Sequence, residues 1–99
     1  MPSDLRGVID TAFVPKLAKK ARLKHDRHAN KTMLMYPERG LELNDAAAAI
    51  AQKLDGTRSI GAIADELVRE HEGAPRAEVE RDVIAFVSDL RDKGLLELE

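Results

Sequence analysis

The stretch TMLMYPERGLELN, residues 32–44, contains two apolar segments around a turn. Residues 32–36 are mostly apolar and predict a central strand. The shorter segment 41–43 alternates apolar and polar side chains, as a half-buried strand does. Between them, Pro37 presets the backbone for a turn, and Gly40 can take a positive φ that closes a hairpin. The stretch therefore predicts two antiparallel strands joined by a tight turn.

The residues on either side extend this pattern. Residues 21–25 alternate in the same way, which predicts strands near 21–25, 32–36 and 40–43. Asn44 is a good helix cap, and three apolar stripes with helical spacing follow it. They predict helices near 45–54, 60–71 and 77–93, separated by glycine breaks at Gly56 and Gly73. Three strands followed by three helices predict an α+β domain that resembles a winged helix with an N-terminal antiparallel sheet.

The chain has 99 residues, enough for one domain with one core. Residues 1–14 show neither a helical nor a strand period over their whole length and predict a mobile N-terminal arm. Residues 5–13 have the spacing of a short helix, and the alternative is that this helix packs against the body or a partner. Residues 15–99 form the predicted folded domain. Net charge is −2, divided into +5 over residues 1–31 and −7 over the rest. The basic segment is interpreted as a solvated surface, because it has no aromatic interleaving beyond Phe13.

Composition excludes several classes of site. The chain has no cysteine, so a disulfide framework, an iron–sulfur cluster and a thiolate zinc site are excluded. No apolar run reaches the roughly 20 residues that cross a bilayer, and no signal-peptide core is present, so a cytoplasmic protein without membrane contact is expected.

Catalytic and metal-ligating patterns are also missing. The three histidines do not form a convergent ligand set, so no metal site is expected. Acidic residues of the predicted helices alternate with arginines at ion-pair spacing, which is typical of solvated helix faces. There is no glycine-rich phosphate loop and no serine in a nucleophile context. We therefore expect no catalytic residue, no cofactor and no enzyme activity from this chain alone.

A winged-helix pattern raises DNA binding as an alternative. Affinity for DNA depends on neutralising phosphates with basic side chains. Residues 76–93 carry four basic and five acidic side chains, and residues 60–72 are more acidic still. Acidic helices favour a partner other than nucleic acid.

The predicted third strand offers a different kind of site. An unpaired edge strand beside an apolar helix can bind an extended peptide, which adds one more strand to the sheet. The alternative is an edge that is merely short and protected from pairing. The residues alone leave both open.

Several motifs together resemble the PqqD family. They are the YPE turn at 36–38, Gly40, the LN pair at 43–44, the apolar positions Ala47, Ile50 and Leu54, the DG pair at 55–56, and Ile60, Ile63 and Leu67. The resemblance covers roughly residues 15–98. Thr32 and the Gly94-Leu95 pair depart from it, since the family often has an aromatic residue before the second strand's apolar part and a Gly-Trp pair after the last helix.

The resemblance implies a peptide chaperone of pyrroloquinoline quinone (PQQ) biosynthesis with a winged-helix-like fold. Such a protein holds a ribosomally made precursor peptide and presents it to a radical S-adenosylmethionine (SAM) enzyme that carries the iron–sulfur clusters. A recognition domain of another modified-peptide pathway is the alternative.

The predicted peptide site lies between the third strand and the third helix. The third strand has a free edge in a sheet of this order, and the apolar residues of 77–93 span a wider arc than one buried stripe needs. Arg91 is expected to pair with a peptide carboxylate. The alternative assigns the helix residues to the core and the peptide to the basic arm. The predicted site residues are Leu41, Glu42, Leu43, Val83, Phe86, Val87, Leu90 and Arg91.

Overall fold

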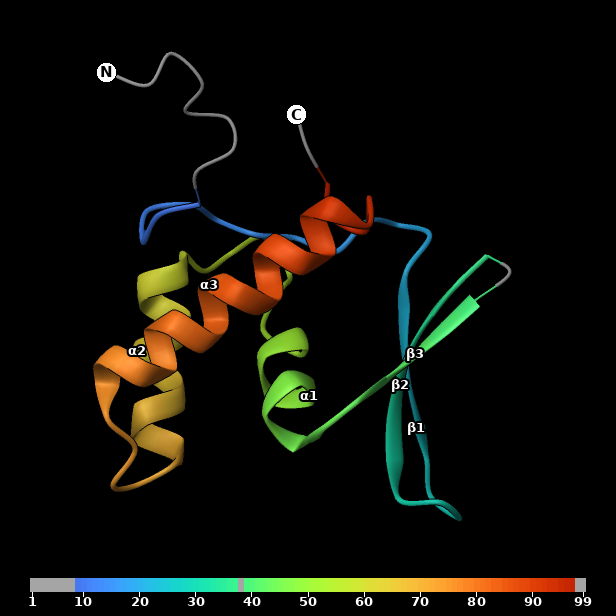
Figure 1. Ribbon diagram of the computed structural model, residues 1–99, viewed down its shortest axis with the longest axis horizontal. Coiled ribbons are helices and arrows are strands. Elements are labelled where there is room, and N and C mark those ends of the chain that lie inside the picture. Colours follow the sequence, from blue (N-terminus) through green and yellow to red (C-terminus); the bar gives the residue numbers. More distant parts are fainter. Residues whose placement is uncertain (1–8, 38, 98–99) are drawn as a thin grey trace.

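The computed structural model describes residues 9–37 and 39–97. Three strands precede three helices, and α1 lies between the sheet and the α2–α3 pair (Figure 1). The bounds are β1 Arg22–Asp26, β2 Lys31–Tyr36, β3 Arg39–Leu43, α1 Asp45–Ala51, α2 Ile60–Glu70 and α3 Arg76–Asp92. The predicted α+β class and the order of its elements are confirmed. None of the helices in the described part of the chain is long and apolar enough to cross a membrane.

The sheet is antiparallel with the order β1-β2-β3. Its register aligns Leu23, Leu34 and Leu41 in one row across the three strands. Leu34 is fully buried, and the other two pack against the same core. Because side chains alternate between faces, Met33 and Met35 lie on the opposite, outer face. The sheet therefore has one apolar face, which packs toward α1.

The hairpin between β2 and β3 differs from its prediction at one position. Gly40 lies inside β3, directly opposite Met35, and not in the turn. Among the described glycines, those with positive φ are Gly56, Gly73 and Gly94. The turn itself includes Glu38, which is outside the described residues.

Helix α1 begins where the sequence predicts and ends earlier. Asn44 caps it, since its side-chain oxygen accepts a hydrogen bond from the amide of Ala47 at 2.7 Å. The helix ends at Ala51, whereas the expected end was residue 54. Leu54 is still buried, but it lies after the turn that ends the helix. Its carbonyl accepts a hydrogen bond from the amide of Leu17 at 3.0 Å. Helical spacing identified a core residue and misplaced the helix end, because a turn can bury the same side chain.

Helices α2 and α3 pack against each other and contain the most deeply buried side chains. Ser59 caps α2 through a 3.1 Å hydrogen bond from the amide of Ala62, as predicted. Gly94 follows α3 with φ +74°. After it, the amide of Leu95 donates to the carbonyl of Leu90 at 2.9 Å, and both side chains are buried. Leu95 and Leu96 thus belong to the core.

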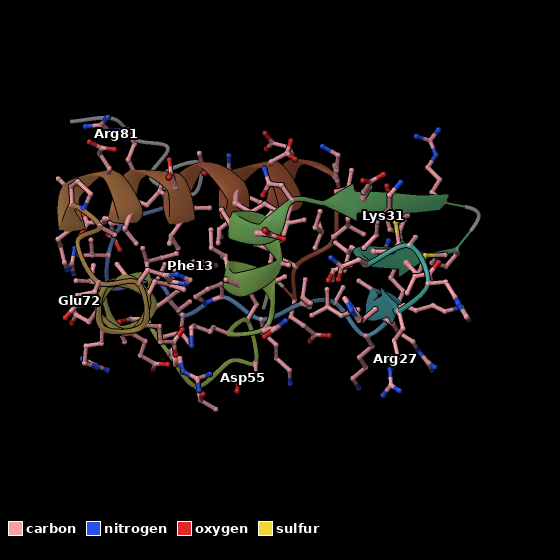
Figure 2. All side chains as sticks on the ribbon, turned by 90° about the horizontal axis from the view of Figure 1, so that it is seen from below. Phe13, Arg27, Lys31, Asp55, Glu72 and Arg81 are labelled. Carbon is pink, nitrogen blue, oxygen red and sulfur yellow. The ribbon has the colours of Figure 1, made fainter. Side chains whose placement is uncertain are left out.

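Part of the expected mobile arm packs on the domain. Residues 1–8 lie outside the described residues. The carbonyls of Thr11 and Phe13 accept hydrogen bonds from the amides of Gly61 and Ile60, at 3.0 and 2.8 Å. Ile9 is buried, and Phe13, labelled in Figure 2, packs against the core. Residues 9–14, which the sequence assigns to a mobile arm, thus contact the domain: carbonyls of Thr11 and Phe13 accept hydrogen bonds from amides at the start of α2 that have no acceptor within the helix.

Candidate peptide-binding site

The sheet has two free edges, those of β1 and β3, because its order is β1-β2-β3. The order of the elements in the sequence had predicted a free edge for β3 alone. β1 reads RLKHD, with four exposed polar residues, and charged side chains on an edge discourage pairing with another strand. β3 carries Leu41 and Leu43 on its inward face and leads directly into α1. The β3 edge is therefore the better place for an added strand.

An open trough continues from the end of β3 along the groove between α1 and α3. Its volume is about 440 Å³. The lining residues come from α1 and its cap on one side and from one row of α3 on the other: Asn44, Ala46, Ala47, Ile50, Asp82, Ala85, Phe86 and Asp89. Small alanines on both walls keep the trough open, and Phe86 provides its largest apolar surface. We call this feature the trough.

Three of the predicted site residues on α3 do not reach the trough. Val83, Val87 and Leu90 have no exposed surface and belong to the core cluster. A peptide on the surface cannot contact them while the domain stays closed. For these residues the structure matches the alternative that assigns them to the core alone. Phe86 is the predicted α3 residue that lines the trough.

Arg91 lies on another side of α3. It is nine residues beyond Asp82, which is two and a half helical turns and places it on the opposite side of the helix. Its guanidinium donates to the carboxylate of Asp92 at 3.2 and 3.3 Å. The structure therefore does not bring Arg91 to the trough, where the prediction had placed it beside the peptide.

The predicted residues of β3 are brought together at the edge. Leu41 is half-buried and Leu43 is buried, so both contribute the strand's inward surface. Glu42 points to the outer face and is 3.4 Å from the ammonium of Lys31. That pair is exposed and contributes little to stability. Strand β3 can thus offer main-chain groups along its edge and one apolar face to a bound peptide.

Sequence reasoning missed the acidic side chains of the trough. Asp82 and Asp89 are seven residues apart, with Ala85 and Phe86 between them, so the four share one face of α3. The same spacing was available in the sequence. Asp82 was predicted to lie on a solvated helix face and Asp89 was assigned to no site, because nothing in the sequence places α1 opposite this row.

The described residues include no cluster of metal ligands and no buried charged side chain. No set of three potential metal ligands occurs among residues 9–37 and 39–97. In the same ranges no charged or polar residue is buried, and no buried side-chain nitrogen or oxygen lacks a partner. General acid–base catalysis needs a desolvated titratable group, which this trough does not provide.

The sequence is similar to one protein family and to named relatives. Residues 31–96 match the family model for coenzyme PQQ synthesis protein D (PqqD). A relative from Xanthomonas euvesicatoria pv. vesicatoria, named PqqA binding protein, is 45% identical over 84 residues, which are 85% of this chain and 90% of the relative.

Two solved structures share the fold. One is the solution NMR structure of the PqqD truncation of Methylobacterium extorquens PqqCD, a stand-alone recognition element for ribosomally synthesised and modified peptides. It is 31% identical, with a TM-score of 0.80, and the match covers 95% of this chain and 99% of that one. The other is lasso peptide synthetase B1 complexed with the leader peptide, 26% identical with a TM-score of 0.71, covering 86% and 99%.

Proposed function

This chain belongs to the PqqD family, and on that premise we propose that it is a non-catalytic peptide chaperone of PQQ biosynthesis. It binds the PqqA precursor peptide in the cytoplasm and presents it to a radical SAM enzyme, which supplies the iron–sulfur chemistry. The observation that carries the proposal is the free edge of β3 beside the trough, in a fold shared with a leader-peptide complex.

Strand addition explains how such a surface holds a peptide. Main-chain hydrogen bonds to the β3 edge give affinity without requiring a particular sequence. Alternate side chains of the added strand then point toward the trough, where Ala47 and Ala85 leave room and Phe86 offers an apolar contact. Specificity comes from those side chains.

Nucleic acid is a poor alternative partner for this surface. Helix α3 carries three arginines and five carboxylates, and two of those carboxylates, Asp82 and Asp89, line the trough. Phosphate groups would be repelled there. A duplex DNA mobility assay should show no salt-sensitive retardation, and retardation would contradict this exclusion.

An NMR titration tests the peptide site. ¹⁵N-labelled chain is titrated with PqqA from Xanthomonas euvesicatoria, and a scrambled peptide of the same composition is the control. We expect the largest shift changes at residues 39–44 and at Ala47, Ala85 and Phe86. Changes confined to residues 9–31 and weakened strongly by salt would mean that the basic segment holds the peptide, and the proposed site would be wrong.

A second experiment tests the absence of catalysis. The purified chain is incubated with PqqA, S-adenosylmethionine and a reductant, without the radical SAM enzyme. The peptide mass should stay unchanged. A mass change in this sample would show that the chain is an enzyme.

A further inference from the structure

A second pocket lies at the far end of the trough, where α1 meets the end of α2 and the start of α3. Its volume is about 280 Å³. Ala49 and Ile50 of α1, Leu67 of α2 and Val79 of α3 make its walls mainly apolar. A cavity of about 150 Å³ is enough for a benzene ring. The pocket can therefore take one large apolar side chain, and we call it the anchor pocket.

The anchor pocket is continuous with the trough. Ala46, Ile50 and Asp82 line both. From Asp89 at one end to Val79 at the other, the row of α3 residues spans ten positions, or about 15 Å at 1.5 Å per residue. An extended peptide covers that distance in about five residues at ~3.3 Å each. A peptide on the β3 edge can thus reach the anchor pocket a few residues after it leaves the strand.

The mouth of the anchor pocket is negatively charged. Asp45 and Asp82 both line it and both are exposed. Neither has an ion-pair partner among the described residues, whereas Asp89 is paired with Lys93 at 2.7 Å and Glu80 with Arg76 at 2.6 Å. His71 also lines the pocket and is exposed. A cationic side chain is the complement to two unpaired carboxylates.

The chain's own described N-terminal segment does not cover this pocket. Thr11 and Phe13 are bonded to the first residues of α2, Ile60 and Gly61. Leu67 and His71, which line the pocket, lie at the other end of that helix. Ten residues of helix, about 15 Å, separate the two ends. Among residues 9–37 and 39–97, the N-terminal segment thus leaves the pocket accessible to a partner.

We propose that the anchor pocket is a second recognition point for the precursor peptide. It binds a large apolar side chain that neighbours a lysine or arginine, in the stretch of peptide that continues past the end of β3. The inference rests on the proposed function: the edge strand gives register, and the anchor pocket selects the peptide by one apolar side chain and one cation.

Filling the pocket tests the inference. Ala49 lines the anchor pocket and not the trough, so Ala49→Leu should occupy the space meant for the peptide side chain. We expect a loss of about tenfold in affinity for PqqA, as for removal of one interface anchor. The matched control is Ala77→Leu, the same change at an exposed position of α3 that lines neither cavity. It should bind as the wild type does.

A second variant tests the charge without altering the pocket's volume. Asp45→Asn should weaken binding about threefold at low salt and reduce the dependence of affinity on salt. Peptides shortened from either end complete the test. One of the two shortenings should remove the difference between wild type and Ala49→Leu, which identifies the stretch of peptide in the pocket.

The outcomes separate the two proposals. If wild type binds PqqA with shifts at β3 and the trough, but Ala49→Leu and Asp45→Asn bind equally well and Val79 does not shift, the anchor pocket is not a peptide site. If wild type does not bind PqqA at all, the proposed function fails and the inference fails with it. Reduced affinity of both variants, with Ala77→Leu unchanged, supports the inference.

Discussion

At the scale of single residues, one carboxylate joins α2 to the turn that precedes it. Glu66 accepts a hydrogen bond from Nε of Arg58 at 2.7 Å and one from Nζ of Lys53 at 3.1 Å. Lys53 also contacts Glu70 at 2.9 Å. The Arg58 bond first, and then the Lys53 bond, hold the pKa of Glu66 below its ordinary value of 4.5. The ion pairs tie residues 53–58 to the outer face of α2.

The lowered pKa predicts how stability depends on pH. A carboxyl with a lower pKa in the folded state stabilises the fold above its unfolded pKa, and this contribution is lost as pH falls through the folded pKa. The free energy of unfolding should therefore drop below about pH 4.5, and Glu66→Gln should make the drop shallower. Urea unfolding at a series of pH values measures it. Glu72→Gln, at an exposed residue with no ion pair among the described residues, is the control and should keep the wild-type slope.

The backbone conformation of Gly56 predicts that a substitution there lowers stability. Its φ is +82°, and an added Cβ would lie 3.0 Å from Cδ of Lys16. Gly73 has a similar φ of +89° with nothing within 4 Å of an added Cβ, which makes it a matched control. Each change to alanine should cost about 1–2 kcal/mol for the left-handed backbone. Gly56→Ala should cost more, because Lys16 must also move. Equal losses in thermal or urea unfolding would show that the contact with Lys16 carries no cost.

At the scale of elements, α3 presents two different faces. Its core face carries Val83, Val87 and Leu90, and the face toward the trough carries Phe86 between Asp82 and Asp89. Helical spacing predicts that these apolar residues lie on one broad arc. Spacing alone cannot separate the core residues from the trough residues, because that separation depends on where α1 and β3 pack. Spacing therefore predicted the strand and the helix, whereas three of the five predicted site residues on α3 are core residues.

The two faces predict opposite effects of truncation. Leu90→Ala removes a fully buried side chain and should lower the free energy of unfolding by about 2–5 kcal/mol. Phe86→Ala removes the aromatic surface of the trough and should weaken PqqA binding about tenfold or more, with a smaller loss of stability. Calorimetric titration and urea unfolding of both variants provide the comparison. If Phe86→Ala binds PqqA as tightly as the wild type, the trough is not in contact with the peptide.

At the scale of the whole molecule, the segment 16–18 packs beside the segment 95–97. The amide of Ala18 donates to the carbonyl of Leu95 at 2.8 Å, and the amide of Glu97 donates to the carbonyl of Lys16 at 2.8 Å. The sequence predicted neither contact, because both depend on pairing between segments almost eighty residues apart. Local patterns such as caps, turns and alternation were enough to predict the helices and strands. The hydrogen bonds between residues 16–18 and 95–97 could be found only in the tertiary structure.

The sequence pattern predicted that the domain begins at residue 15. The contacts of residues 9–14 predict instead that these residues belong to the stable domain. A chain of residues 15–99 loses the acceptors of Thr11 and Phe13 for the first amides of α2, and it exposes the core around Ile9. Loss of the buried Ile9 side chain, which contributes about 1.5–3 kcal/mol, and of the two hydrogen bonds should lower the free energy of unfolding. Residues 9–99 are the matched comparison, since the two chains differ only in 9–14. Urea unfolding followed by circular dichroism measures the difference. If both chains unfold at the same urea concentration, residues 9–14 are a dispensable arm, and the predicted boundary at residue 15 is the right one.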